Sequence, residues 1–275
     1  MQLFVRSVIL STVILLSISC LGQVDRSYIA DSISNEGKRL YESEMTSWYG
    51  TDVFLEKFKE ESENIGGYFS YKDGESFKCL FFSKGDKPNV LGVITFIGSF
   101  DPKMAQSDGT KREFTEKEKD YYTIRNAALN EIKSDTSLFK RYKNTEINLI
   151  PLIDKDEKKV YVLTATSQSG IVIIGNDYLL LFTKTNELLS KRKIHANLIT
   201  LPTKLEEKTA DGNTTVGSVH NHLPETGELM TATDVCTFML YERFSNWKQQ
   251  IVISQKYMSI WNCGSNKLII VPTGR

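Results

Sequence analysis

One short segment near the carboxyl end carries the side chains best suited to hold a metal ion. His220 and His222 are separated by a single residue, and Asp234 follows after a short loop. Apolar residues before His220 predict a strand, and positions i and i+2 of a strand point to the same face, so both imidazoles can reach one ion. Two histidines, one carboxylate and an open position for water are typical of a catalytic zinc site. The sequence therefore predicts Zn²⁺ bound by His220, His222 and Asp234.

The elements around this segment must bring the three ligands together. A loop containing Pro224 and Gly227 turns the chain after the predicted strand, and a helix opens at Thr231. Thr231-x-x-Asp234 is also the pattern of a helix capping box, which would by itself explain both residues; the nearby histidine pair favours a ligand role for the aspartate. The third histidine, His195, lies between apolar neighbours on a predicted strand, and we interpret it as structural.

The same residues resemble a known metalloprotease-like superfamily. His-x-His, a short loop and then Thr-x-x-Asp is similar to the JAB/MPN (JAMM) motif His-x-His-x7-Ser-x-x-Asp, and the proline soon after the histidines resembles its RadC-like branch. Here eight residues, not seven, separate His222 from the hydroxyl residue, which is Thr231. Strands predicted at 250–254, 257–261 and 268–271 follow in the order of that superfamily. The resemblance covers residues 146–275.

The resemblance implies a function and roles for further residues. It implies a hydrolase that cleaves an amide or isopeptide bond in a peptide or protein, with Thr231 stabilising the oxyanion. The superfamily uses a glutamate on an earlier strand as general base; Glu157 is our first choice, with Glu187 and Glu225 as alternatives. Without a base to take the proton from water, hydrolysis would be slow. The alternative is therefore a non-catalytic envelope or secreted binding protein that keeps a JAB/MPN-like fold.

The remaining pattern predicts an α+β protein. Residues 27–60 have helical periodicity, interrupted at Gly50-Thr51-Asp52, and are followed by a hairpin at Asp73-Gly74, a third strand from Val90 and a second helix with a capping box at Thr115. Strands succeed one another from 147 to 201. We expect N-terminal helices with a β-hairpin or meander over residues 23–145, and a JAB/MPN-like mixed sheet with a flanking helix over 146–275. A single continuous domain is the alternative.

Composition limits the partners. The 275-residue chain has 34 basic and 34 acidic residues, and this zero net charge argues against nucleic-acid binding. Apart from Cys20, three cysteines remain, at positions 79, 236 and 263; none forms a C-x-x-C pair, and at most one disulfide can form.

The first 22 residues have the pattern of a secretory signal peptide. Arg6 precedes an apolar run, 8–18, which ends in small residues. Cleavage after Gly22 would leave Gln23 first, whereas Ile18-Ser19-Cys20 resembles the end of a lipoprotein signal, which would tether the protein through a lipid on Cys20. A retained anchor helix is the third interpretation. We expect an exported protein, periplasmic or secreted or lipid-anchored in the outer membrane, that meets a membrane only through such a lipid.

Mass spectrometry of the mature amino terminus tests export. We expect a chain that begins at Gln23, or alternatively a lipid-modified Cys20, because the short apolar run is removed by a signal peptidase. An intact Met1 terminus on cytoplasmic protein would contradict both forms.

Overall fold

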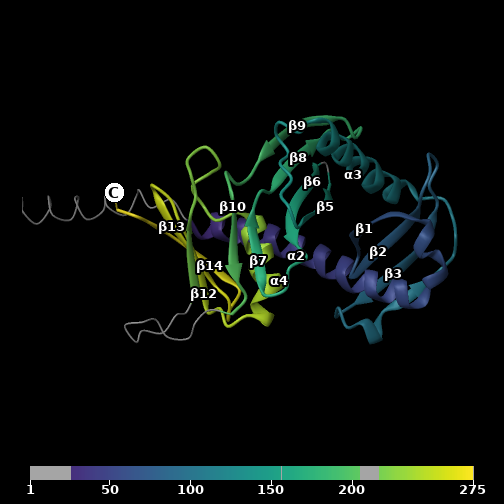
Figure 1. The fold of residues 1–275 in the computed structure, drawn as a ribbon, viewed down its shortest axis with the longest axis horizontal. Coiled ribbons are helices and arrows are strands. Elements are labelled where there is room, and N and C mark those ends of the chain that lie inside the picture. Colours follow the sequence, from purple (N-terminus) through teal and green to yellow (C-terminus); the bar gives the residue numbers. More distant parts are fainter. Residues whose placement is uncertain (1–25, 156, 205–216, 275) are drawn as a thin grey trace, which may run out of the picture.

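The computed structural model describes residues 26–155, 157–204 and 217–274. Helices and mostly antiparallel sheets are mixed along the chain, so the predicted α+β class is confirmed (Figure 1). The predicted signal peptide, with Cys20, lies outside the described residues. Cys79, Cys236 and Cys263 are free thiols.

A first sheet follows the long amino-terminal helix. β1 (Ile65–Asp73), β2 (Ser76–Ser83), β3 (Val90–Ile97) and the short β4 (Gln106–Asp108) pair in sequence order as an antiparallel meander. The predicted hairpin is present, with Asp73 opposite Ser76. Gly74 has φ +60° and Glu75 does not have a positive φ, so the turn meets the requirement of type II′ rather than type I′.

Helix α3 (Glu116–Ser134) begins with the predicted capping box. Thr115 accepts a bond from the Glu118 backbone, and the Glu118 carboxylate accepts one from the Thr115 N–H. The same carboxylate binds the Arg112 guanidinium at 2.6 and 2.8 Å and accepts the Tyr71 hydroxyl at 2.9 Å. Burial raises the pKa of Glu118, but these donors outweigh it and hold the pKa at about 2. The network fixes α3 on the first sheet.

Helix α2 (Arg26–Lys57) is continuous, so the predicted interruption at 50–52 is wrong. A Cβ atom on Gly50 would lie 2.5 Å from the Cβ of Cys79 on β2. The glycine therefore lets the helix and the sheet approach each other closely and does not interrupt the helix. Its low helix propensity destabilises a 32-residue helix only slightly. At its other end α2 packs near the last strands, so it extends along both halves of the molecule (Figure 1).

The middle of the chain forms a second antiparallel sheet and a strand pair. β5 (Thr145–Asp154), β6 (Glu157–Thr166), β8 (Tyr178–Phe182) and β9 (Leu188–Lys193) lie in the order β5-β6-β8-β9. β7 (Ile171–Gly175) leaves this order and pairs with β10 (Leu198–Pro202). The segment from Ile194 to Asn197 therefore connects the second sheet to the pair.

The last sheet is mixed. β11 (Gly217–Asn221) runs parallel to β12 (Gln249–Ile253), which is followed by antiparallel β13 (Tyr257–Asn262) and β14 (Lys267–Pro272). Helix α4 (Ala232–Tyr241) connects the two parallel strands. It is buried on nearly every side, including Val235, Phe238 and Leu240, because the sheet covers one face and α2 covers another.

The crossing of α2 and α4 depends on Gly37. A Cβ atom there would lie 2.5 Å from Cγ1 of the fully buried Val235 and 3.0 Å from the Ala232 carbonyl oxygen. Two helices can approach this closely only if one side chain is absent. Because Asp234 adjoins Val235, the same contact sets the position of the predicted metal ligand.

Replacing Gly37 with Ala tests this packing. We expect a loss of about 1–2 kcal/mol in the free energy of unfolding, because overpacking at a fixed crossing exceeds the gain in helix propensity. Urea unfolding measures it. Gly264→Ala is the control, since its Cβ would meet nothing closer than 3.6 Å, and it should change stability by less than about 0.5 kcal/mol. A Gly37→Ala protein as stable as the wild type would contradict the argument.

Candidate functional site: a buried histidine and aspartate cluster

The predicted histidine pair lies at the end of β11. His220 is on the strand, opposite Val252 of β12, and His222 follows the strand directly. The His222 backbone N–H donates to the Ile253 carbonyl at 3.0 Å, which extends the strand pairing by one step. This extended backbone places both imidazoles on the same side, and their Nε2 atoms are 3.3 Å apart.

Asp234 reaches the histidines from the first turn of α4. Its side chain is fully buried, and its Oδ2 accepts hydrogen bonds from the Thr231 backbone N–H and the Thr231 hydroxyl, both at 2.8 Å. The Asp234 N–H in turn donates to the Thr231 Oγ1 at 3.1 Å. The capping-box interpretation and the ligand interpretation therefore describe one side chain, because the cap holds the carboxylate where the imidazoles converge.

His195, which we interpreted as structural, joins the cluster. Its Nε2 lies 3.1 Å from Asp234 Oδ1 and 3.3 Å from Thr231 Oγ1. His195, His222 and Asp234 have ligand atoms within 4.8 Å of one another and form a buried group that could hold a metal ion. On the far side of the ring, Nδ1 lies 3.3 Å from Oδ2 of the buried Asp177. Sequence reasoning missed His195 because it follows a different strand.

The turn before β8 explains where His195 lies. The Ile194 N–H donates to the Asp177 carbonyl, and the Asn176 N–H donates to the Asn197 carbonyl, so the two segments run against each other. Gly175 has φ +93°, and a Cβ atom there would lie 2.2 Å from the Asn197 oxygen. In the sequence, Gly175 indicates that another segment approaches this turn closely. It does not indicate which segment that is.

The distances within the cluster fit a tetrahedral ion. Besides the 3.3 Å between the histidines, His222 Nε2 lies 3.5 Å from Asp234 Oδ2 and His220 Nε2 lies 3.7 Å from Asp234 Oδ1. Zinc bonds of about 2.0–2.1 Å in a tetrahedral arrangement put ligand atoms roughly 3.3 Å apart. The two histidines are thus at the separation that such an ion requires, although they approach different oxygens of Asp234, and the group with all ligand atoms within 4.8 Å of one another contains His195 in place of His220.

The protonation states also suit a cation. His222 Nδ1 lies 2.9 Å from the Leu229 carbonyl oxygen, which can only accept, so Nδ1 carries the proton and Nε2 presents its lone pair to the cluster. Burial lowers the pKa of His222, and it lowers the pKa of His220 to about 4, so both rings are neutral at pH 7. Neutral imidazole is the form that binds metals.

The carboxylate and the third histidine carry the charges of the cluster. Burial raises the pKa of Asp234, but the neighbouring histidines, His195 first, outweigh it and hold this pKa far below its usual range. Burial lowers the pKa of His195, yet Asp234 and Asp177 together raise it to about 10. Without a metal ion, a protonated His195 is thus the counter-charge of Asp234.

Buried polar atoms in the cluster lack hydrogen bonds. Asp234 Oδ1 and His220 Nδ1 have no hydrogen-bond partner, and the approach of His195 to Asp234 Oδ1 is close but not aligned for a hydrogen bond. A buried carboxylate oxygen without a hydrogen bond is destabilising, because it has lost its bonds to water and gained none from the protein. A cation among these atoms would remove that cost, so the donor set fits a metal ion.

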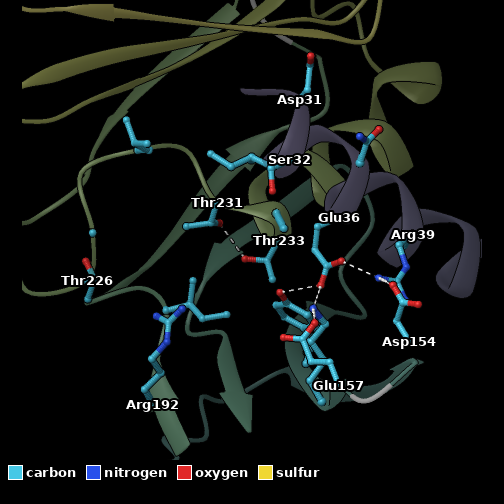
Figure 2. A pocket seen from close by; sticks show the side chains of 18 of the residues that line it. Asp31, Ser32, Glu36, Arg39, Asp154, Glu157, Arg192, Thr226, Thr231 and Thr233 are labelled. Atoms are coloured by element: carbon cyan, nitrogen blue, oxygen red, sulfur yellow. Dashed lines mark hydrogen bonds and ion pairs between the residues drawn. The ribbon is translucent and has the colours of Figure 1, made fainter. Parts of the chain in front are cut away.

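Two cavities reach the cluster from different sides. A small one of about 100 Å³ is lined by the three histidines together with residues of the 196–199 and 221–226 segments. A large cleft of about 980 Å³ is lined by Thr231 and Thr233 at the start of α4, by the amino-terminal part of α2 and by β9 (Figure 2). Thr226 lines both cavities, so the loop after His222 separates them.

The three candidate bases lie apart from the histidines. Glu157 is exposed at the start of β6, lines the large cleft and forms an ion pair with Lys159 at 3.0 Å. Glu187 is exposed between β8 and β9, and Glu225 is exposed on the loop after His222. Glu187 and Glu225 are not part of the lining of the large cleft or of the small cavity.

Comparison with protein-family models, curated proteins and solved structures finds no match. Within the described ranges, no helix is both long and apolar enough to cross a bilayer. The site geometry is therefore the basis for assigning a function.

Replacing Thr231 with Val tests the cap that holds Asp234. In chelator-treated protein we expect Thr231→Val to lower the free energy of unfolding by about 1 kcal/mol, because the helix loses its side-chain cap and the carboxylate loses a donor. Thr231→Ser keeps the hydroxyl and should stay close to wild type in the same urea titration. A Thr231→Val protein as stable as the wild type, or a larger loss in Thr231→Ser than in Thr231→Val, would contradict the role of the hydroxyl.

Proposed function

We propose that the protein is an exported zinc-dependent hydrolase of JAB/MPN type that cleaves an amide or isopeptide bond. The observation that carries the proposal is the convergence of the His220 and His222 imidazoles, 3.3 Å apart, on the buried Asp234 carboxylate, whose Oδ1 makes no hydrogen bond. Imidazole nitrogen and carboxylate oxygen are ligands that zinc accepts. The His-x-His and Thr-x-x-Asp pattern supports the choice of superfamily.

The chain supplies the binding and proton-handling groups in this proposal. When bound, zinc would acidify a water molecule and polarise the scissile carbonyl. Leu229 fixes the tautomer of His222, and the α4 cap fixes Asp234. Thr231 lies where the cluster meets the large cleft, and its hydroxyl, which donates to Asp234 Oδ2 in the structure, is proposed to turn and donate to the oxyanion.

Glu157 is retained as the proposed general base. It lines the same cleft as Thr231, which Glu187 and Glu225 do not. The Lys159 ammonium lies 3.0 Å from its carboxylate and holds it at the edge of the cleft. A peptide in the cleft would lie between this carboxylate and the start of α4.

His195 favours a second candidate function. If its Nε2, 3.1 Å from Asp234 Oδ1, also binds the metal, three imidazoles and one carboxylate fill a tetrahedral site. A four-coordinate site without an open position is structural. The protein would then be a non-catalytic envelope or secreted binding protein whose metal joins three segments of the chain.

Metal analysis of the purified protein tests the proposal. We expect one zinc per chain in wild type and severe loss in His220→Ala and His222→Ala, because each removes a whole ligand. Asp234→Asn should weaken binding less, since it keeps the shape and loses the charge. Asn221→Ala, between the two histidines, is the control and should keep the metal. Equal zinc in wild type and the His220→Ala/His222→Ala double variant would refute the site.

His195→Ala distinguishes the two functions. A catalytic site predicts that His195→Ala and Thr231→Val keep zinc, and that Thr231→Val hydrolyses a peptide or isopeptide substrate more slowly, because its hydroxyl acts in the transition state. A closed site predicts that His195→Ala loses zinc as severely as His222→Ala. The second result, together with no hydrolysis by wild type, would favour the binding protein.

A further inference from the structure

The large cleft beside Thr231 contains many charges, and most of them neutralise one another. Lys159, itself buried, binds Glu36 at 2.7 Å and Glu157 at 3.0 Å. Glu36 also accepts the Tyr161 hydroxyl at 3.1 Å and pairs with Arg39 at 3.2 Å. Asp154 lies 3.6 Å from Arg39, so these groups form a fixed wall whose carboxylates outnumber its cations.

Arg192 is the exception among the basic side chains that line the cleft. Arg39 and Lys159 are paired with carboxylates, whereas the exposed side chain of Arg192, whose backbone pairs with Leu179, forms no ion pair or side-chain hydrogen bond with any described residue. Figure 2 shows Arg192 reaching from β9 into the cleft near Thr226, across from Glu157 and the other paired charges. The guanidinium is thus available to a molecule in the cleft.

The chemistry around Arg192 selects a carboxylate. A guanidinium presents a planar fork of N–H donors that matches a carboxylate with two parallel hydrogen bonds. The cleft is also lined by Asp31, which has no ion pair with a described residue, and by the carboxylates of the paired wall. A dianion such as a phosphate monoester would be repelled by this acidic lining, whereas a single negative charge suits the one free guanidinium.

Hydroxyl groups on the other wall indicate a peptide. Thr226, Thr231 and Thr233 line the cleft between Arg192 and the start of α4. Thr226 donates to the Leu223 carbonyl and Thr231 to Asp234, so these two hydroxyls present acceptor oxygens to the N–H groups of an extended backbone, whereas Thr233 is fully buried. The cleft, at about 980 Å³, has room for several residues of a peptide.

We propose that Arg192 is a specificity-determining residue that binds a carboxylate of a peptide substrate lying in this cleft. This rests on the proposed function for the cleavage step, but the binding step does not need it. The carboxylate comes from the carboxyl terminus of the peptide or from an acidic side chain. Either source presents the same fork-shaped acceptor to Arg192.

Fluorescence polarisation with four labelled hexapeptides tests the proposal on the full-length mature protein. The peptides share a neutral sequence and carry a free carboxyl terminus, a carboxamide terminus, a carboxamide with an internal Glu, or a carboxamide with an internal Gln. We expect wild type to bind at least one carboxylate peptide about tenfold more tightly than its neutral counterpart, because charge-assisted hydrogen bonds are lost with the carboxylate. The peptide that shows the preference identifies the source.

Three variants show whether Arg192 causes the preference. Arg192→Gln should abolish it, Arg192→Lys should retain part of it because the charge remains without the fork, and the exposed Lys267→Gln should leave it unchanged. Equal binding of carboxylate and neutral peptides by wild type, or an intact preference in Arg192→Gln, would overturn the proposal. Zinc measured on the same samples separates the two proposals: a metal-free wild type that still prefers carboxylates refutes the zinc site and not the role of Arg192.

Discussion

The buried carboxylate of Asp234 is the interaction on which the rest of the site depends. It caps α4 through Thr231, and it faces His195, His220 and His222 from the interior of the protein. An isolated carboxylate at this depth would be strongly destabilising, so the structure must provide positive charge close to it. Without a metal ion a protonated His195 provides that charge, and with one the cation would. The same residue is therefore both a structural constraint and the centre of the proposed chemistry.

That constraint also explains the architecture around the cluster. The carboxylate can be fully buried because α2 crosses α4 at a glycine, and the imidazoles can reach it because β11 ends where α4 begins. His195 arrives from the second sheet through a connection that needs Gly175. Three separate segments of the chain thus share one polar centre. Two hydrophobic clusters pack against α4 beside it, and the two cavities approach it.

Local pattern was enough to predict part of this arrangement. The alternation of a strand put His220 and His222 on one face, and the capping box at Thr231 set the direction of Asp234, because both rules act within a few residues. His195 could not be found in this way, since its position depends on pairing between the 176–177 turn and the 194–197 segment. The interruption predicted at Gly50 failed for a related reason: local propensity indicated a break, while a tertiary contact with Cys79 explains the glycine.

The course of α2 has a consequence for how the chain reaches its native state. Ala30 near the start of this helix packs in the same cluster as Leu268 and Ile270 of β14, at the opposite end of the chain. That face of α2 also packs on α4, but its contact with β14 can form only when the last described strand has been made. Contacts between such distant segments slow folding, because closure of the intervening chain costs entropy before the contact forms. The cluster that joins α2 to β14 is therefore the last to be completed, whereas the contacts of α2 with β1, β2 and β3 can form earlier in synthesis.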